Sequence, residues 1–190
     1  MKKFAMICAA VMAALLLLSG CSGGTPAQAV EKTLEAIKTS DVKTFNQYVS
    51  GDSSLFADSE SWGTGEWDLM HVMYQNLSYK VQETKVEGGT ATVSCEITNT
   101  DFSKIIMNAM GEIVSATLAG EMDDADEAAV AQKMLDSMKQ AADSGEVETV
   151  TETVDITLVK DGSNWKVKID DALLNALGGG NLDDVTDIMQ

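Results

Sequence analysis

The chain has 190 residues, with 30 acidic and 13 basic side chains and a formal net charge of −17 at pH 7. All 13 basic residues are lysines, so the arginine side chains that read nucleic-acid bases and phosphates are absent. This length suits one domain, and the acidity excludes a nucleic-acid partner on electrostatic grounds and favours a soluble, self-repelling surface.

The N-terminal segment has the layout of a secretory signal. Lys2 and Lys3 precede an apolar run from Phe4 to Leu18, and small residues follow. The run of about 15 residues is shorter than the roughly 20 that a permanent membrane-spanning helix needs, so a retained transmembrane helix is the weaker alternative. We expect residues 1–20 to be a signal peptide that is removed from the mature protein.

The end of this segment, Leu18-Ser19-Gly20-Cys21, resembles the lipobox of bacterial lipoproteins. The resemblance implies that Cys21 is acylated, for example with palmitate, and becomes the first mature residue, with residues 21–25 as a short tether. Two acyl chains are enough for stable anchoring. We therefore expect a lipid-anchored, extracytoplasmic protein of the cell membrane; the alternative is a plain secretory signal in which Cys21 lies near the cleavage site by chance.

Two short helices are expected after the tether. Thr25 can cap a helix that starts at Pro26 and repeats apolar residues at helical spacing, namely Val30, Leu34 and Ile37. Asp41 can cap a second helix that carries Val42, Phe45 and Val49. Each helix should bury one face.

Residues 51–66 mix glycine, serine and acids without a period, which predicts a loop. Trp62 and Trp67 flank its end, and we interpret them as a lid on the core, with an exposed recognition platform as the alternative. From Trp67 onward the spacing of Leu69, Val72, Met73 and Leu77 predicts a third helix. His71 lies within it, and we interpret this histidine as a packing residue, with a general base or metal ligand as the alternative.

A first hairpin is expected from Tyr79–Val86 and residues 91–98, which flank a turn at Gly88 and Gly89. Cys95 lies on the apolar side of the second strand. Because Cys8 leaves with the signal and Cys21 is acylated, no intramolecular disulfide is possible. We interpret Cys95 as a buried structural thiol, with a reactive thiol as the alternative.

Two helices are expected between the hairpins. Asp101 can cap the first, whose apolar residues are predicted to form one broad face: Phe102, Ile105, Ile106, Met110, Ile113, Val114 and Leu118. An acidic run at 123–127 precedes the second, which carries Val130, Met134, Leu135 and Met138. We interpret the acids as complementing the helix dipole; a calcium loop is the alternative, although the run lacks the glycine and closing glutamate of an EF-hand. We expect no metal site and no cofactor.

A second hairpin is expected around Asp161-Gly162, with Val154, Ile156 and Leu158 before the turn and Trp165, Val167 and Ile169 after it. Asp170 or Asp171 can cap a short helix that ends at glycines 178–180. We expect one α+β domain over residues 26–180 and a C-terminal tail over 181–190. In this domain a curved antiparallel sheet of about four strands is packed on one face by helices, cone-like, with two inserted helices between the hairpins.

The order of the predicted helices and strands resembles that of a known group of proteins. The hairpin ending in CEITNTDFSKI (95–105) and the closing hairpin around LVKDGSNWKV (158–167) resemble uncharacterised small lipoproteins of Gram-positive bacteria with a domain like nuclear transport factor two. The resemblance covers nearly the whole mature chain and implies a cone-shaped sheet wrapped around helices. Because such families have no assigned activity, it implies nothing about chemistry.

No complete catalytic set is recognisable. An Asp-Arg-Asp set for epoxide opening is excluded because arginine is absent, and paired histidines are excluded because His71 is the one histidine. An enzyme that uses a tyrosine and carboxylates in the cone remains an alternative, drawn from Tyr48, Tyr74, Tyr79, Asp155 and Asp170. That alternative requires a carboxylate with a raised pKa in a dry pocket.

The leading hypothesis is a lipid-anchored binding or protein-interaction module, because an anchor and a compact fold are predicted without a catalytic set. A small-molecule or protein partner in the cell envelope is expected beside the membrane itself. Candidate pocket residues between sheet and helices are Met107, Met110, Met134, Met138 and Tyr79, with ordinary core packing as the alternative for the methionines. A purely structural envelope protein is a further alternative.

Overall fold

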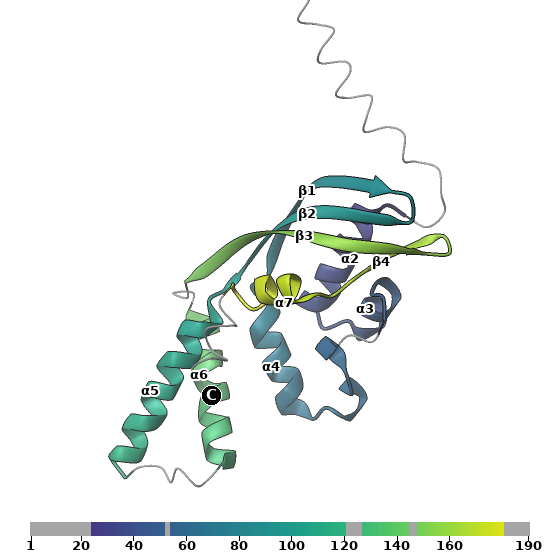
Figure 1. Ribbon diagram of the computed structural model, residues 1–190. Helices are drawn as coiled ribbons and strands as arrows, with labels where there is room; N and C mark the ends of the chain where they lie inside the picture. The colour runs from purple at the N-terminus through teal and green to yellow at the C-terminus, as the bar shows by residue number, and fades with distance from the viewer. Residues whose placement is uncertain (1–23, 52–53, 121–126, 145–147, 181–190) are drawn as a thin grey trace, which may run out of the picture.

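The computed structural model describes residues 24–51, 54–120, 127–144 and 148–180. The predicted signal peptide, Cys21, most of the acidic run at 123–127 and the C-terminal tail lie outside these residues. The described chain forms the α+β fold that the sequence predicts, with a sheet packed by helices (Figure 1).

The elements follow the predicted order. The helices are α2 (Pro26–Lys38), α3 (Val42–Tyr48), α4 (Thr64–Tyr74), α5 (Phe102–Leu118), α6 (Glu127–Ser144) and α7 (Asp171–Leu177), with short 3-10 turns at Ser54–Phe56 and Ser59–Ser61. The strands are β1 (Ser78–Glu87), β2 (Thr90–Thr100), β3 (Thr149–Asp161) and β4 (Asn164–Val167). They pair antiparallel in the order β1-β2-β3-β4, so both predicted hairpins are confirmed.

The main core lies between the sheet and helices α2 and α7. Val93, Cys95 and Ile97 of β2 alternate with half-exposed neighbours and are fully buried, as the period-two pattern predicts. Opposite them lie the buried side chains of α2 and α7, namely Val30, Leu34, Ile37, Leu173, Ala176 and Leu177. Figure 1 shows α2, α3 and α7 on the same side of the sheet.

Side-chain caps begin four of the helices at the predicted residues. Thr25 and Gln28 form a reciprocal capping box at the start of α2. The carboxylates of Asp41, Asp101 and Asp170 each accept a hydrogen bond from the backbone N–H three residues later. These helix starts could be predicted from the sequence because a capping side chain binds a backbone N–H three residues away and needs no distant partner.

The region before β1 differs from the sequence prediction. Helix α4 begins at Thr64, within the predicted loop, because Gly63 occupies the N-cap position and leaves the next residues free to adopt helical geometry. Trp62 and Trp67 form an edge-on pair with ring centroids 5.0 Å apart and pack against the main core, in agreement with the lid interpretation. His71 lies on the exposed side of α4, so its assignment as a packing residue is wrong.

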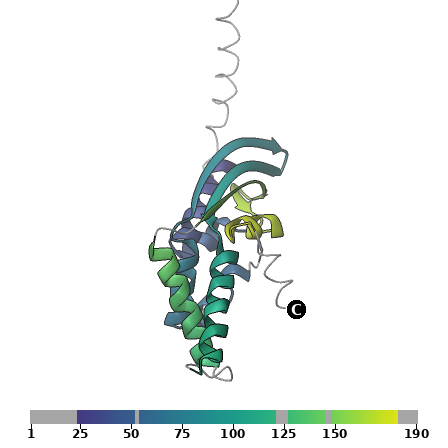
Figure 2. The same cartoon turned by 90° about the vertical axis from the view of Figure 1, so that its left-hand side faces the viewer.

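A second, smaller core holds α4, α5 and α6 together. Its buried residues are Val72, Phe102, Ile105 and Met138. Lys139 Nζ of α6 also lies 2.7 Å from Asp68 Oδ2 of α4. Helices α5 and α6 therefore form a projecting pair that shares little of the main core (Figures 1 and 2).

The two cores meet at the end of β2. The Asn99 side-chain amide, which is fully buried, donates hydrogen bonds to Met73 O of α4 at 3.0 Å and to Leu177 O of α7 at 2.6 Å. Gly179 passes so close that a Cβ atom there would lie 2.2 Å from Thr100 O. This junction sets the direction in which α5 leaves the sheet.

Candidate functional site

Side chains occupy the interior between the sheet and its helices. Residues that face each other across it, such as Leu34, Ile97 and Leu158, are 0–1% exposed. Three hollows in the described structure lie elsewhere, two along α5 and α6 and one beside the start of α2. The candidate surfaces for binding therefore lie on the outside of the domain.

The predicted pocket residues do not share one pocket. Met107 and Met110 are 57% and 39% exposed on the outer side of α5, whereas Met138 is 5% exposed in the small core. Met134 is partly buried beside Met138. Tyr79 lies on β1 and packs against the main core instead. The structure thus brings together Met134 with Met138, and Met107 with Met110, but not the five residues.

Tyr79 is held by α2. Its hydroxyl lies 3.3 Å from both Glu31 O and Glu35 Oε2. Burial, followed by the negative charge and hydrogen bonding of Glu35, raises the pKa of Tyr79 to about 12. A phenol with this pKa stays protonated near neutral pH and is a poor general base.

The other tyrosines and carboxylates of the enzyme hypothesis are dispersed. Tyr74 is the buried last residue of α4, and burial raises its pKa to about 12. Asp155 is exposed on β3, and Asp170 caps α7. Tyr48 borders the hollow beside the start of α2. The structure does not assemble a tyrosine–carboxylate set from these residues.

Cys95 agrees with the structural interpretation. Its side chain is fully buried in β2, and burial raises the pKa of the thiol to about 11. A thiol with this pKa carries almost no thiolate at neutral pH, so it is unreactive as a nucleophile.

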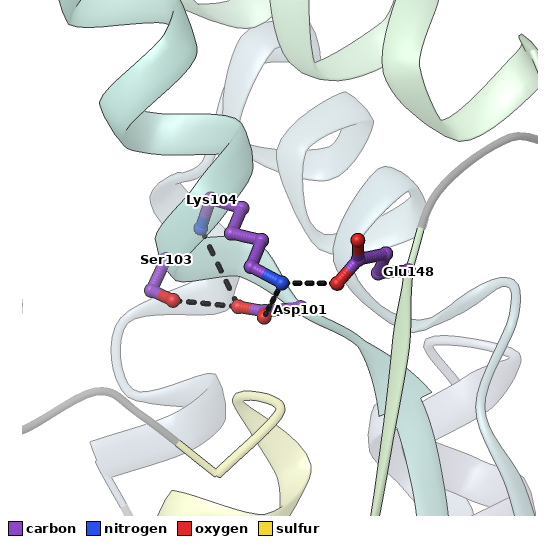
Figure 3. A network of polar contacts seen from close by, with 4 residues as sticks. All are labelled: Asp101, Ser103, Lys104 and Glu148. Atoms are coloured by element: carbon purple, nitrogen blue, oxygen red, sulfur yellow. Dashed lines mark hydrogen bonds and ion pairs between the residues drawn. The ribbon is translucent and has the colours of Figure 1, made fainter.

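Asp101 anchors the base of α5 in a polar network (Figure 3). Its Oδ1 accepts hydrogen bonds from Ser103 Oγ at 2.5 Å and from the Lys104 backbone N–H at 3.4 Å. Lys104 Nζ lies 3.6 Å from Asp101 Oδ2 and also pairs with Glu148, next to the start of β3. The network joins the first turn of α5 to the strand on which the chain returns.

The pKa of Asp101 is lowered, not raised. Burial alone would raise it, but the hydrogen bonds from Ser103 and Lys104 and the charge of the Lys104 ammonium outweigh that effect. Asp101 is therefore ionised at neutral pH and has a structural role, unlike the protonated carboxylate that the enzyme hypothesis requires.

The outer side of α5 is the most unusual surface of the described chain. Of the six large hydrophobic side chains that are exposed among the described residues, four belong to α5: Met107, Met110, Val114 and Leu118. They recur every three or four residues, so they form one stripe along the helix, which we call the α5 outer face. Leu118 is 84% exposed and Val114 56%.

The α5 outer face is also uncharged, although the chain is strongly acidic. Between Ile105 and Ala119 the sequence contains one ionisable residue, Glu112. Glu112 points to α6, where Lys133 Nζ and Ser137 Oγ each lie 3.2 Å from its Oε2. A helix that is apolar on both sides is normally covered on both sides.

A groove of about 930 Å³ borders this face. It is lined on α5 by Met107, Asn108, Glu112 and the small residues Gly111, Ser115 and Ala116, by the C-cap Ala119, and by Lys133 of α6. The small residues let another chain approach the α5 backbone closely. The face and groove together offer a shallow, elongated surface, a better fit to a protein segment than to an enclosed small molecule.

The sequence pattern predicts one broad apolar face on α5. The structure buries Phe102, Ile105 and Ala109 and leaves the α5 outer face exposed. The pattern contained a usable signal, because the predicted face includes both Ile105 and Val114, which lie on opposite sides of the helix, and is therefore wider than a single buried face. The lack of charge opposite the buried residues was the feature that sequence reasoning missed.

The α5–α6 pair lies far from the start of the domain. The hollow beside α2 is lined by Gly24, Thr25 and Asn164, so the beginning of α2 is next to the β3–β4 turn. Helices α5 and α6 connect to β2 and β3 at the opposite end of these strands, beyond Thr100 and Thr149. Figure 1 shows this pair projecting from the other end of the sheet.

Known proteins support the fold. The chain matches no family model and no curated protein. It is similar to the crystal structure of YcdA from Bacillus subtilis, described as a candidate lipoprotein, with 13% identity and a TM-score of 0.52 over 80% of this chain and 54% of that chain. This chain therefore spans about half the length of YcdA, and the likeness shows the fold alone.

A second solved structure, an LEH-like epoxide hydrolase from Mycobacterium tuberculosis, matches this chain over a larger share of each sequence than YcdA does. The match extends over 87% of this chain and 93% of that chain at 10% identity. Its TM-score of 0.31 is too low to support any argument about this protein.

The role of Asp101 gives a pH-dependent prediction. Because the folded-state pKa is lower than the unfolded value of about 3.9, the carboxylate stabilises the fold above that value, and the contribution is lost as the pH falls through the folded-state pKa. Asp101→Asn should lower the free energy of unfolding by about 1–2 kcal/mol at neutral pH and by less near pH 2.5.

Urea denaturation at the two pH values measures this difference. Asp155→Asn, at an exposed position on β3, is the matched control and should not change stability at either pH. A penalty for Asp101→Asn that is the same at both pH values would show that the negative charge is not what the network needs.

Proposed function

We propose that this protein is a lipid-anchored, extracytoplasmic interaction module that binds a protein partner through the α5 outer face. The observation that carries the proposal is the exposed, uncharged apolar stripe from Met107 to Leu118 on a chain with a net charge of −17. Burying such a stripe against another protein releases free energy in proportion to the apolar area removed from water.

Three features support the lipid anchor. The sequence Leu18-Ser19-Gly20-Cys21 has the lipobox pattern, although Cys21 lies outside the described residues. YcdA, which shares the fold, is described as a candidate lipoprotein. Among the described residues, no helix combines the length and the apolarity needed to cross a membrane. We also propose that this protein is one of the small lipoproteins that have a domain like nuclear transport factor two, as the sequence resemblance implies.

The anchor fixes the orientation of the proposed binding surface. Because α2 starts at Pro26, a tether from Cys21 spans about five residues and reaches at most roughly 18 Å. The membrane then faces the end of the sheet that holds the β3–β4 turn, and the α5–α6 pair points away from it. This orientation presents the α5 outer face to another protein of the envelope and keeps it away from lipid.

The chemistry of the α5 outer face indicates which class of partner it can bind. A stripe with exposed side chains every three or four residues fits the apolar face of an amphipathic helix. Since the remainder of the chain is acidic, lysines or arginines that flank this helix would speed association and disfavour acidic competitors. The partner class is therefore a basic, amphipathic helical segment.

The anchor is tested by labelling growing cells with an alkyne analogue of palmitate. Wild-type protein should take up the label, and Cys21→Ala should lose it because the acylated thiol is gone. Ser22→Ala is the matched control and should keep the label. Label on Cys21→Ala, or none on wild type, would contradict the lipid anchor.

The binding surface is tested with the double variant Val114→Asp, Leu118→Asp. Both side chains are exposed, so the variant should fold, but the charges should reduce the partner complex at least about tenfold. Native gels of mildly solubilised membranes measure the complex as a band above the monomer.

The control places the same two charges on the exposed side of β3, as Thr151→Asp, Thr153→Asp, and should keep the complex. A wild-type protein that migrates as a monomer would argue against a partner. Equal loss in both double variants would argue against the α5 outer face.

A further inference from the structure

One part of the sheet has an unpaired edge. β3 has 13 residues and β4 has 4, so β4 pairs only with residues 158–161 of β3. One further bond on this side, from Lys168 N–H to Thr157 O at 2.8 Å, ends the contact. Figure 1 shows β4 beside only the hairpin end of β3. Residues 149–156 therefore have a strand on one side only, and we call their other side the β3 edge.

The register shows which backbone groups of the β3 edge are free. In an antiparallel pair the N–H and C=O of one residue point to the same side, and successive residues alternate. Lys160 N–H bonds to Gly89 O on the β2 side, so the even-numbered residues of β3 face β2. The backbone groups of Thr151, Thr153 and Asp155 face away from β2, and no other described residue pairs with them. All three residues are exposed, so the packed helices leave this edge open to solvent.

The opposite edge of the sheet is protected, whereas the β3 edge is not. Along β1 lie four charged side chains, namely Lys80, Glu83, Lys85 and Glu87. The pairing of β1 with β2 also shifts at a bulge between Val81 and Thr84. Charged side chains and bulges keep an edge strand from pairing with another chain. The open part of β3 pairs with β2 in unbroken register and presents β-branched threonines, at positions 149, 151 and 153.

The surroundings of the β3 edge are acidic. Asp155 is exposed, and none of the ion pairs among the described residues includes it. Beyond Lys168, which bonds to Thr157, the chain continues with two exposed acids, Asp170 and Asp171. Basic side chains on an added strand are therefore attracted to this edge, and acidic side chains are repelled.

A second copy of this chain fits the β3 edge less well than a basic segment does. It would bring a further net charge of −17 to an edge that is already acidic. An extended basic segment instead gains main-chain hydrogen bonds along the edge and a cross-strand ion pair with Asp155.

We propose that the β3 edge is a second binding surface, which adds an extended, basic segment of a partner protein as a fifth strand of the sheet. Thr151, Thr153 and Asp155 supply the backbone hydrogen bonds, and the Asp155 carboxylate pairs with a lysine or arginine of the segment. This surface goes beyond the proposed function, because the α5 outer face binds a helix through apolar contacts and the β3 edge binds a strand through its backbone.

A synthetic peptide of alternating valine and lysine is the probe. N-methyl groups on its valines leave one edge able to pair with β3 and prevent the peptide from forming sheets with itself. The control peptide has the same sequence with every residue N-methylated, so it keeps the charge but has no backbone N–H to donate. In fluorescence anisotropy, the purified mature protein should bind the first peptide at least about tenfold more tightly than the control. Equal affinities would overturn the proposal in favour of charge attraction alone.

Hydrogen exchange followed by NMR locates the contact. In the free protein the amides of Thr151, Thr153 and Asp155 should exchange fast and those of their even-numbered neighbours slowly, because only the latter bond to β2. Bound peptide should slow exchange of the three amides at least about tenfold. Slowing at Tyr79 and Val81 of β1 instead would overturn the proposal. Slow exchange at the three amides in the free protein would also overturn it, in favour of a second copy if dilution restores fast exchange and of a cover from the same chain if it does not.

A proline variant tests the backbone directly. Thr153→Pro removes an N–H that β2 does not use, so the strand should still form, but peptide affinity should fall at least about tenfold. Val86→Pro is the matched control, because the Val86 N–H faces away from β2 on the exposed edge of β1, and it should bind the peptide like wild type. Equal loss of affinity in the two variants, or none in either, would contradict pairing at the β3 edge.

A charge reversal tests the ion pair without a change in the backbone. Asp155→Lys should weaken binding of the valine–lysine peptide and strengthen binding of a valine–glutamate peptide with the same N-methyl groups. Unchanged affinities for both peptides would contradict the choice of a basic segment.

This inference and the proposed function fail separately. Val114→Asp, Leu118→Asp alters the α5 outer face and should leave peptide binding unchanged; loss of binding there would place the peptide on α5 and overturn the β3 edge. The control variant of the native-gel test, Thr151→Asp, Thr153→Asp, changes side chains and keeps every backbone group of the β3 edge.

Discussion

The arrangement of this molecule depends on the buried amide of Asn99. One side chain at the end of β2 binds the last carbonyls of α4 and α7, which come from segments 26 residues before it and 78 residues after it. Buried carbonyls without a donor are unfavourable, so these bonds hold α4, the sheet and α7 in one fixed relation. Asp101 follows two residues later and starts α5, so the direction of the α5–α6 pair is set by the same junction.

The junction separates two parts with different physical roles. On one side, the sheet, α2 and α7 form a closed core in which residues such as Val93 and Leu158 are fully buried. On the other side, the small core around Phe102 and Met138 holds only the inner surfaces of α5 and α6. The main core does not need the outer face of α5, so the composition of that face is free to serve binding.

The contrast between the uncharged α5 outer face and the acidic remainder of the chain is the main support for the proposed binding surface. The acidic surface makes copies of the protein repel each other, which limits aggregation through the apolar stripe before a partner covers it. The stripe stands at the opposite end of the domain from Gly24, the first described residue, to which the proposed tether would connect. In the function proposed above, the anchor, the charge and the stripe together describe a protein that is held at the membrane and presents its binding surface away from it.

Much of the fold was predictable from local chemistry. Thr25, Asp41, Asp101 and Asp170 cap helices with their own neighbours, and Gly88 and Gly162 make turns with positive φ, so short stretches of sequence were sufficient. Long-range packing was not predictable in this way. Period alone identified α5 as amphipathic but did not show which of its two apolar sides α4 and α6 would cover.

The candidate site was harder to predict for the same reason. Met107 and Met110 were singled out from sequence, yet as lining of an interior pocket, because a cone-like fold suggests a hollow centre. Leu34, Ile97 and Leu158 occupy that centre instead. The uncharged run from Ile105 to Ala119 was visible in the sequence, but its meaning depended on which side remained in contact with water.

The central claim is that the α5 outer face is covered in the working protein. The most direct measurement compares methionine oxidation by dilute peroxide in native membranes with oxidation of the purified protein, using mass spectrometry. Met107 and Met110 are exposed and report on the face, while Met138 is buried and provides an internal reference. The account predicts slower oxidation of Met107 and Met110 in membranes with Met138 unchanged; equal oxidation in both samples would contradict it.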